Sequence, residues 1–477
     1  MMNEVRMKLE YGNRSFKREV TELASAFFKS FLLEESPLGD SSEGRGFQLS
    51  IEIDGDEREI NVRRRTVTLS KMELEAAGGA VEKLVKAAVY RLFSELSGKD
   101  LPWGTMTGIR PVKLYRKLME EDPESAEARL EREYFLRHDK VEMLGLVYQA
   151  EERILTPGSR DQLQIYAGIP FCPSRCSYCS FASVKAKQDR SDIKEYLNGL
   201  FREIREVGET VGRNRKAQSI YIGGGTPGIL TKDEISELIE LLKTYFPDYQ
   251  ELTFEGGRPD VLDREKLAAA VTAGATRISI NPQTMDDEIL GRLGRTHDSK
   301  AVVQRFHEAR ECGCNDINMD LILGLPGDTM DGFLRSLDKV ASLEPDSITV
   351  HALALKRSSH FHQNGLEEVR MDAEVGSKTW ERLLRKGYSP YYLYRQKNTF
   401  MNLENVGYAK NTKDCIFNMQ SMSDIQSCFA FGADGVSKFV TESGIERIHN
   451  PKFPKDYLYE LRSVIEKKLT ILHEGRY

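Results

Sequence analysis

Three cysteines in one short stretch of this 477-residue chain could do metal chemistry. Cys172, Cys176 and Cys179 form a C-x3-C-x2-C array. Four cysteine thiolates usually hold the irons of a [4Fe–4S] cube, so three thiolates would leave one iron open to another ligand. A zinc site is the alternative, but structural zinc sites normally take four protein ligands, and residue 180 is Ser180. The array therefore favours an iron–sulfur cluster over zinc.

A glycine run farther along could bring the main chain close to a ligand. Gly223, Gly224 and Gly225 precede Thr226 and Pro227. Glycine has no Cβ and adopts positive φ readily, so main-chain groups here could grip the charged head of an amino-acid-like ligand. An ordinary turn has the same composition, and the position of the run after a strand favours the binding interpretation.

Polar residues at expected strand ends form a third group of candidates. Glu255, Gln283 and Asp320 end or follow three successive expected strands. Their carboxylate and amide groups could bind ribose hydroxyls and an ammonium group, and Arg295 could pair bidentately with a carboxylate. His351 could donate to a substrate or be a satisfied core histidine. An ordinary polar strand end is the alternative for each residue, but their occurrence at neighbouring strand ends favours a shared site.

These candidates need strands that deliver them to one place. From residue 163 onward, apolar runs alternate with helical periodicity, which predicts an α/β fold with a parallel sheet and helices outside it. Six strands are expected, at 163–167, 219–222, 251–255, 276–280, 317–322 and 347–352. The candidates follow strands, and in β/α barrels the chemistry takes place at the carboxyl ends of the strands. The pattern therefore places the candidates at one end of a barrel-like sheet.

The remaining segments are predicted to form two further parts. Residues 1–158 are expected to be a small α/β domain that ends in a helical linker. Residues 159–390 carry the strand–helix repeats, and residues 391–477 are expected to be a C-terminal α+β extension that covers the open barrel mouth and supplies substrate contacts. Within this extension, 416–420, 426–435 and 436–440 are expected to be strands and turns.

Composition excludes several classes of protein. Hydrophobic residues make up 40% and charged residues 30% of the chain, which is ordinary for a soluble globular protein. A net charge of −6 argues against a general nucleic-acid binder. We expect no membrane span and no signal peptide. Seven cysteines, three of them in one loop, suit a reducing cytosol, so a cytoplasmic enzyme without a nucleic-acid partner is expected.

The cysteine array resembles the radical S-adenosylmethionine (SAM) superfamily, and within it the oxygen-independent coproporphyrinogen III oxidase group, in its HemZ branch. The matching segments are IPFC at 169–172, GGGTPG at 223–228, RISINPQT at 277–284, LGRTH at 293–297, DLILGLPGDT at 320–329 and, for the HemZ branch, LPWGTMTGIRPVKLY at 101–115 and PYYLYRQKN at 390–398. The resemblance implies a partial (β/α)6 barrel. It also implies a [4Fe–4S] cluster on Cys172, Cys176 and Cys179, with SAM on the open iron.

The resemblance further implies a set of cofactor-binding residues. Those predicted to contact SAM are Tyr166, Tyr178, Gly224, Gly225, Thr226, Glu255, Gln283, Arg295, Asp320 and, through its backbone, Ala352. Tyr166 and Glu255 are also predicted to be catalytic. One SAM site or two neighbouring ones could use this set.

The resemblance implies a tetrapyrrole substrate with carboxylate groups, so the pocket needs cations. The predicted substrate-binding residues are Lys356, Arg357, Arg395 and Lys397, with Arg258 as a further candidate. Lysines and arginines on loops usually only solubilise a protein. The compact block at 390–398 strengthens the prediction for Arg395 and Lys397.

The resemblance implies a coproporphyrinogen III dehydrogenase that forms protoporphyrinogen IX with an electron donor such as flavodoxin or ferredoxin. The chain departs from characterised oxidases, which have a histidine where this chain has Gly168 and a fourth cysteine where it has Ser180. A haem chaperone and a radical-SAM enzyme for another tetrapyrrole are the alternatives. Segment 403–408 lacks the His and Trp of the chaperones' haem-transfer motif, which favours the enzyme.

Overall fold

The computed structural model describes residues 5–11, 14–28, 31–38, 45–53, 63–108, 110–155, 161–179, 181–354, 369, 371–372, 374–396, 399–441 and 444–474. The chain divides into two compact units. The N-terminal unit comprises Met1–Gly145 and Arg395–Leu403, and the barrel unit comprises Leu146–Tyr394 and Glu404–Tyr477. Predicted boundaries at 158 and 390 therefore differ from the structure. The chain enters the barrel unit within α6 (His138–Ile154), and residues 395–403 belong to the N-terminal unit.

The N-terminal unit is a sheet of four strands packed against helices. The strand order is β2-β1-β3-β4, with β1 parallel to β2 and antiparallel to β3. Side chains alternate along a strand, so Val5, Met7 and Leu9 of β1 are buried against α1 and α3. The elements are β1 (Val5–Tyr11), α1 (Lys17–Phe27), β2 (Leu32–Pro37), β3 (Arg45–Ile53), β4 (Arg63–Ser70), α2 (Lys71–Ala77), α3 (Val81–Ser97), α4 (Pro111–Glu121) and α5 (Ala126–Tyr134).

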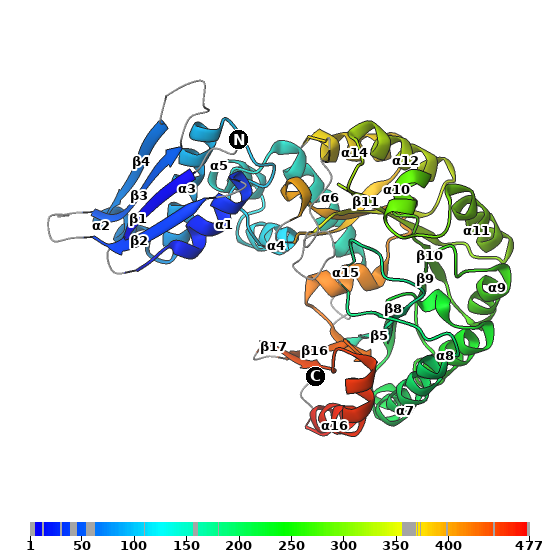
Figure 1. The fold of residues 1–477 in the computed structure, drawn as a ribbon. Coiled ribbons are helices and arrows are strands. Elements are labelled where there is room, and N and C mark those ends of the chain that lie inside the picture. The colour runs from blue at the N-terminus through cyan, green and yellow to red at the C-terminus, as the bar shows by residue number, and fades with distance from the viewer. Residues whose placement is uncertain are drawn as a thin grey trace. The chain divides into compact units, whose positions relative to one another are not determined.

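The barrel unit contains the six predicted strand–helix repeats. Neighbouring strands of this set pair in parallel, and Figure 1 shows α7, α8, α9, α11 and α12 along the convex side of the curved sheet. The strands are β5 (Leu163–Ile169), β8 (Ala217–Gly224), β9 (Glu251–Gly257), β10 (Arg277–Ile280), β11 (Ile317–Leu323) and β12 (Ser347–Ala352). The helices are α7 (Ser191–Asn214), α8 (Lys232–Tyr245), α9 (Arg264–Ala273), α10 (Asp287–Arg292), α11 (Ser299–Glu311), α12 (Met330–Ser342) and α14 (Glu374–Arg385). The predicted α/β fold with an open, partial barrel is confirmed.

The C-terminal extension is part of this sheet, which was not predicted. The full strand order is β13-β14-β12-β11-β10-β9-β8-β5-β15-β16-β17, so the extension lengthens both edges. Strand β15 pairs in parallel with β5, and all five of its residues are buried. It is therefore an interior strand of the sheet. The elements are β13 (Ser389–Tyr394), β14 (Asn405–Ala409), α15 (Ile416–Ser423), β15 (Ser427–Phe431), β16 (Val436–Thr441), β17 (Gly444–His449) and α16 (Pro454–His473).

A buried carboxylate ties the extension to the repeats. Glu203 of α7 is fully buried and accepts hydrogen bonds from Lys468 Nζ at 2.5 Å, Tyr457 Oη at 2.7 Å and the Gly432 amide at 2.8 Å. Asn450 Nδ2 donates at 3.3 Å to Oε1, the oxygen that Lys468 also contacts, whereas Tyr457 and Gly432 donate to Oε2. Such additional hydrogen bonds offset the cost of burying a charge pair, and through them Glu203 fixes α16 and the β15–β16 turn against α7.

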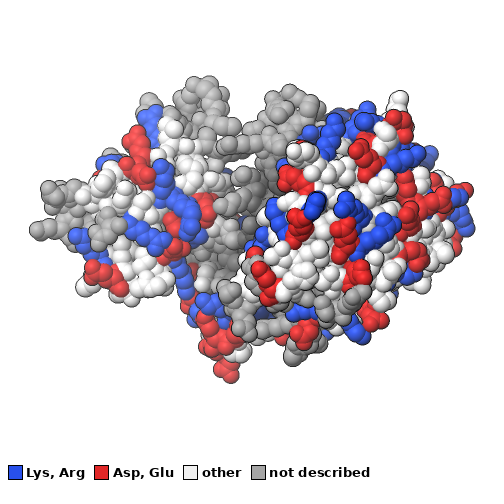
Figure 2. All heavy atoms as spheres, turned by 90° about the horizontal axis from the view of Figure 1, so that it is seen from below, with Lys and Arg blue, Asp and Glu red and all other residues white. Residues whose placement is uncertain are grey.

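The visible surface carries no single-sign patch. On the face drawn in Figure 2, acidic and basic side chains alternate over the barrel unit at the right. Nucleic-acid binders present a basic stripe or patch, and this face does not. Among the described residues, no helix combines the length and apolar character that crossing a bilayer requires.

We predict that Glu203→Gln lowers the free energy of unfolding by about 3–5 kcal/mol, because it leaves the buried Lys468 charge unpaired. Urea titration followed by far-ultraviolet circular dichroism measures the change. Glu206→Gln is the matched control in the same helix. Its side chain is 41% exposed and pairs with Arg202 at the surface, so a loss within about 1 kcal/mol is expected. Equal losses in the two variants would contradict the role given to Glu203.

Candidate cluster and cofactor site

The cysteine array lies on a loop that leaves the end of β5. Cys172 ends β6 (Phe171–Cys172), which pairs in parallel with β7 (Val184–Lys185). A turn closes between the other two cysteines, because the Cys179 amide donates to the Cys176 carbonyl at 3.1 Å. All three thiols are free. Burial raises the pKa of the Cys179 thiol, and the neighbouring Cys172 and Cys176 thiols add to this shift.

The three thiols on this loop suit the ligand pattern of a cube. Each thiolate of a cube binds a different iron, so the three sulfurs must surround the cluster rather than meet at one point. Three free thiols on one loop, with Thr226 donating to Cys172 Sγ and Arg258 donating to Cys176 Sγ, suit this arrangement.

The glycine run packs directly against the cysteine loop. A Cβ on Gly224, whose φ is +115°, would lie 2.9 Å from the Ile169 amide nitrogen. A Cβ on Gly225 would lie 2.7 Å from the Phe171 carbonyl oxygen and 3.0 Å from Cys172 Sγ. The Thr226 hydroxyl donates to Cys172 Sγ at 3.3 Å. The glycines are therefore needed for main-chain contact, and the structure brings the predicted Gly224, Gly225 and Thr226 to the cysteines.

Aromatic side chains form the next part of the site. The Tyr166 ring of β5 stacks on Tyr221 of β8 with centroids 6.3 Å apart, and Phe417 of α15 stacks on Tyr221 at 4.8 Å. Burial raises the pKa of the Tyr166 hydroxyl, so it stays protonated at neutral pH. Tyr221 and Phe417 were not predicted. The parallel register of β5 and β8 places Tyr221 beside Tyr166. Only this pairing of strands points to Tyr221, and the sequence does not give it.

Glu255 is held in place by two neighbours. Tyr221 Oη donates to Glu255 Oε2 at 3.1 Å, and Asn281 Nδ2 donates to Oε1 at 3.2 Å. Burial raises the pKa of the Glu255 carboxyl to about 7, and the Asp320 carboxylate adds to the shift. Glu255 can therefore be charged or neutral near physiological pH, which is the property expected of a site carboxylate.

Asp320 and His351 extend this polar row to the next strands. Asn318 Nδ2 donates to Asp320 Oδ1 at 2.8 Å, and His351 Nε2 lies 3.7 Å from Asp320 Oδ2. Burial opposes charge on His351, but the hydrogen bond and the charge of Asp320 outweigh it and raise the pKa of the imidazole. Tyr394 Oη lies 3.5 Å from His351 Nδ1. Polar side chains thus continue from β9 to β13.

Arg295 lies between this row and the cysteine loop. Its side chain is buried, and it donates to the Asn281 carbonyl at 2.8 Å and to Tyr178 Oη at 2.9 Å. Nε of Arg295 has no hydrogen-bond partner among the described residues. One donor thus fixes Arg295 to Asn281 and another to Tyr178, which lies between two of the cysteines in the sequence. The contact of Arg295 with a carboxylate stays a prediction.

Hydrogen bonds of the main chain hold two of the predicted cofactor residues in place. Gln283 has a positive φ of 70°, its amide donates to the Asp320 carbonyl, and its own carbonyl accepts from Ile322 at 2.9 Å. The Ala352 amide donates to Asn405 Oδ1 at 3.1 Å. These bonds hold both residues at the strand ends, and their contacts to SAM stay predictions.

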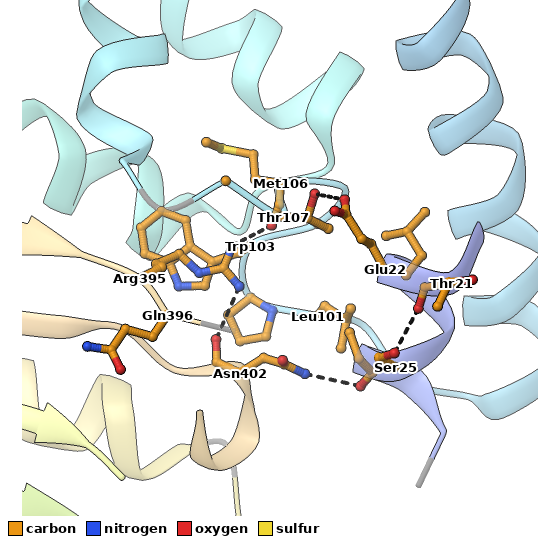
Figure 3. A pocket seen from close by; sticks show the side chains of 15 residues that line it. Thr21, Glu22, Ser25, Leu101, Trp103, Met106, Thr107, Arg395, Gln396 and Asn402 are labelled. Carbon is orange, nitrogen blue, oxygen red and sulfur yellow. Dashed lines mark hydrogen bonds between the residues drawn. The ribbon is translucent and has the colours of Figure 1, made fainter. Parts of the chain in front are cut away.

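Of the predicted substrate cations, Lys356, Arg357 and Lys397 lie outside the described residues. Arg395 belongs to the N-terminal unit and lines a cavity of about 260 Å³ (Figure 3). Its guanidinium carbon lies 5.2 Å from the centroid of the Trp103 ring, and it donates to the Met106 and Asn402 carbonyls. These contacts attach residues 395–403 to the N-terminal unit, and a substrate role for Arg395 stays a prediction.

We predict that Arg395→Lys destabilises the N-terminal unit by about 1–3 kcal/mol, because two carbonyls lose donors and the contact with Trp103 weakens. Trp103 fluorescence during urea unfolding, in a Trp380→Phe background, reports on this unit. Arg65→Lys is the control, because Arg65 is 59% exposed beside Glu95. Unchanged unfolding of Arg395→Lys together with lost activity toward a tetrapyrrole would instead support the substrate role.

Comparison with known proteins connects this site to a family. The family model described as the radical SAM superfamily matches residues 166–340, a range that contains the three cysteines, the glycine run and Asp320. The solved coproporphyrinogen III oxidase HemN of Escherichia coli, described as a radical SAM enzyme, is 23% identical with a TM-score of 0.49, covering 67% of this chain and 72% of that one.

Similar curated proteins show to which family within this superfamily the chain belongs. Heme chaperone HemW of Bacillus subtilis is 34% identical over 201 residues, 41% of this chain and 52% of that protein. Oxygen-independent coproporphyrinogen III oxidase of Pseudomonas aeruginosa is 30% identical over 239 residues, 47% and 51% of the two chains. Oxygen-independent coproporphyrinogen-III oxidase-like protein HemZ of Bacillus subtilis is 36% identical over 411 residues, 83% of this chain and 81% of that protein. The chain therefore belongs to the radical SAM superfamily, and within it to the coproporphyrinogen-III oxidase-like family that includes HemZ.

Proposed function

We propose that this protein oxidatively decarboxylates the two propionates of coproporphyrinogen III that become vinyl groups, giving protoporphyrinogen IX. Each propionate loses one hydrogen atom, one electron and one CO2, and its two remaining carbons form the vinyl group. We further propose that the protein acts in the cytoplasm and receives electrons from a donor such as flavodoxin or ferredoxin. Acting on another tetrapyrrole is the nearest variant of this proposal.

One observation carries the proposal. Glu255, Asp320 and His351 form a row of partly buried polar side chains at the strand ends, and Arg295 connects the same region to the cysteine loop. A haem-biosynthesis enzyme of this superfamily must bind a zwitterionic cofactor next to its cluster, and such a row offers both signs of charge. The oxidase-like name of the HemZ relative supports the same substrate class.

The chain's own residues would hold the cofactors and exclude water. Cys172, Cys176 and Cys179 would hold the cluster. The reduced cluster and SAM together supply a hydrogen-abstracting radical. Tyr166 and Tyr221 would cover the reacting region with their stacked rings and so help to keep water from it. Positioning of the reacting groups is the main contribution expected of the protein.

The charge state of Glu255 suits a role in SAM binding. SAM presents an ammonium group, and a carboxylate that is neutral below about pH 7 would hold that cation only when ionised. Tyr221 and Asn281 direct the two carboxylate oxygens. We propose that Glu255 accepts hydrogen bonds from SAM and releases them when it is protonated.

A haem chaperone is the second candidate, because the HemW of Bacillus subtilis is 34% identical over 41% of this chain and the haem chaperones, like this chain with its Ser180, lack the fourth cysteine of characterised oxidases. The segment that would correspond to the haem-transfer motif argues against it. Residues 405–409 are the fully buried strand β14, paired with β12 and β13, and the Asn405 side chain is engaged by Ala352. A strand inside the sheet is a poor place for an exchangeable haem ligand.

The test is anaerobic incubation with SAM, reductant and coproporphyrinogen III labelled in its propionate carboxyls. We predict labelled CO2 and protoporphyrinogen IX from the parent protein, and neither product from Cys176→Ala. Cys314→Ala is the matched control and should keep activity, because Cys314 is a buried thiol that donates to the Asp316 carbonyl. Stable haem binding by the parent without release of CO2 would favour the chaperone instead.

We also predict that SAM binds several-fold more weakly at pH 6 than at pH 8. A carboxyl with a pKa of about 7 is largely neutral at the lower pH, and the fraction that is charged falls about tenfold for each unit below the pKa. Calorimetric titration at both pH values measures the effect. Glu255→Gln should remove most of the pH dependence, whereas His351→Gln should retain the part that Glu255 causes. A Glu255→Gln variant with the parent's pH profile would contradict this role.

A further inference from the structure

Arg258 directly follows β9 and faces the cysteine loop. The turn that places it needs Gly257, whose φ is +74°, and the Gly257 carbonyl accepts from the Asn281 amide at 2.7 Å. The Arg258 side chain is only 4% exposed. The main chain at the end of β9 is therefore fixed, and the Arg258 side chain is enclosed by the protein.

A carboxylate orients the guanidinium. Arg258 Nε donates to Asp260 Oδ1 at 3.0 Å, and Nη2 donates to Oδ2 at 2.7 Å. Asp260 in turn accepts from Thr296 Oγ1 at 2.6 Å, and His297 Nδ1 lies 3.3 Å from it. A bidentate pair of this kind fixes the plane of the guanidinium. Its charge is largely balanced by Asp260.

The remaining amino group contacts the cysteine loop. Arg258 Nη1 donates to Ser174 Oγ at 2.8 Å, to the Ser174 carbonyl at 3.4 Å and to Cys176 Sγ at 3.7 Å. Thr226 makes the comparable contact with Cys172 Sγ. Arg258 is thus a buried donor to a thiol that would hold the cluster. Its substrate role, which we considered from the sequence, does not agree with this burial and these partners.

Hydrogen bonds to the sulfurs of an iron–sulfur cluster help set its reduction potential. Reduction adds negative charge to the cluster, and a fixed N–H donor stabilises that charge. We propose that Arg258 donates an N–H···S hydrogen bond to the Cys176 thiolate and so makes the cluster easier to reduce, with Asp260 as its positioning residue. This inference rests on the cluster assignment of the proposed function and on no property of the substrate.

The test is a redox titration of the reconstituted full-length protein without SAM, followed by electron paramagnetic resonance of the reduced cluster. Arg258→Gln should lower the equilibrium constant for one-electron reduction about tenfold, which is a midpoint about 59 mV more negative. Arg258→Lys should shift the midpoint in the same direction, because one ammonium group cannot bond Asp260 bidentately and also reach the sulfur. The midpoint does not depend on the loaded fraction, so partial cluster loss does not obscure it.

Arg264→Gln is the matched control, because Arg264 is 59% exposed and pairs with Glu311 at the surface. Its midpoint should equal that of the parent. Midpoints of both Arg258 variants within the scatter of this control would overturn the proposal. Loss of the whole cluster from both variants would also overturn it, since Arg258 is given no role as a ligand. Because no tetrapyrrole is present, the result is independent of whether coproporphyrinogen III is the substrate.

Discussion

The close approach of two main-chain segments is the constraint on which this site depends. The loop with three thiols must lie in contact with the end of β8, and a Cβ on Gly225 would come within 3.0 Å of Cys172 Sγ. Strand β5 must also end at a fixed point, and Tyr196 Oη secures it by donating to the Gly168 carbonyl at 2.6 Å while accepting from the Ala433 amide at 3.0 Å. The C-terminal extension therefore supports the cysteine loop through β5.

The repeats could be predicted from the sequence, whereas the placement of the extension could not. Buried parallel strands are near-continuous apolar runs, which is why β5, β8, β9, β10, β11 and β12 could be predicted. The pairing of β15 with β5 joins Ser427 to Leu163, and no local pattern encodes so distant a partner. Residues 416–420 were expected to be a strand or turn but begin α15, because the Glu251 carboxylate of β9 accepts from the Ile416 and Phe417 amides.

Several residues of the site could be predicted because a local pattern in the sequence identifies them. Cys172, Glu255 and Arg295 occur in motifs whose chemistry is recognisable from residue types, and the structure brings them to one end of the sheet. Tyr221 was missed because its importance comes from a neighbour on another strand. Arg258 was assigned to the substrate because a cation after a strand end does not reveal its partners, and only the fold shows that Asp260 and Cys176 are those partners.

The central claim is that three thiolates hold a cube whose fourth iron is open to SAM. Mössbauer spectroscopy of the ⁵⁷Fe-reconstituted protein, with and without SAM, tests it most directly. We predict that SAM changes the isomer shift and quadrupole splitting of one iron in four and leaves the other three unaltered. A spectrum that SAM does not change, or an iron content too low for a cube, would contradict the claim.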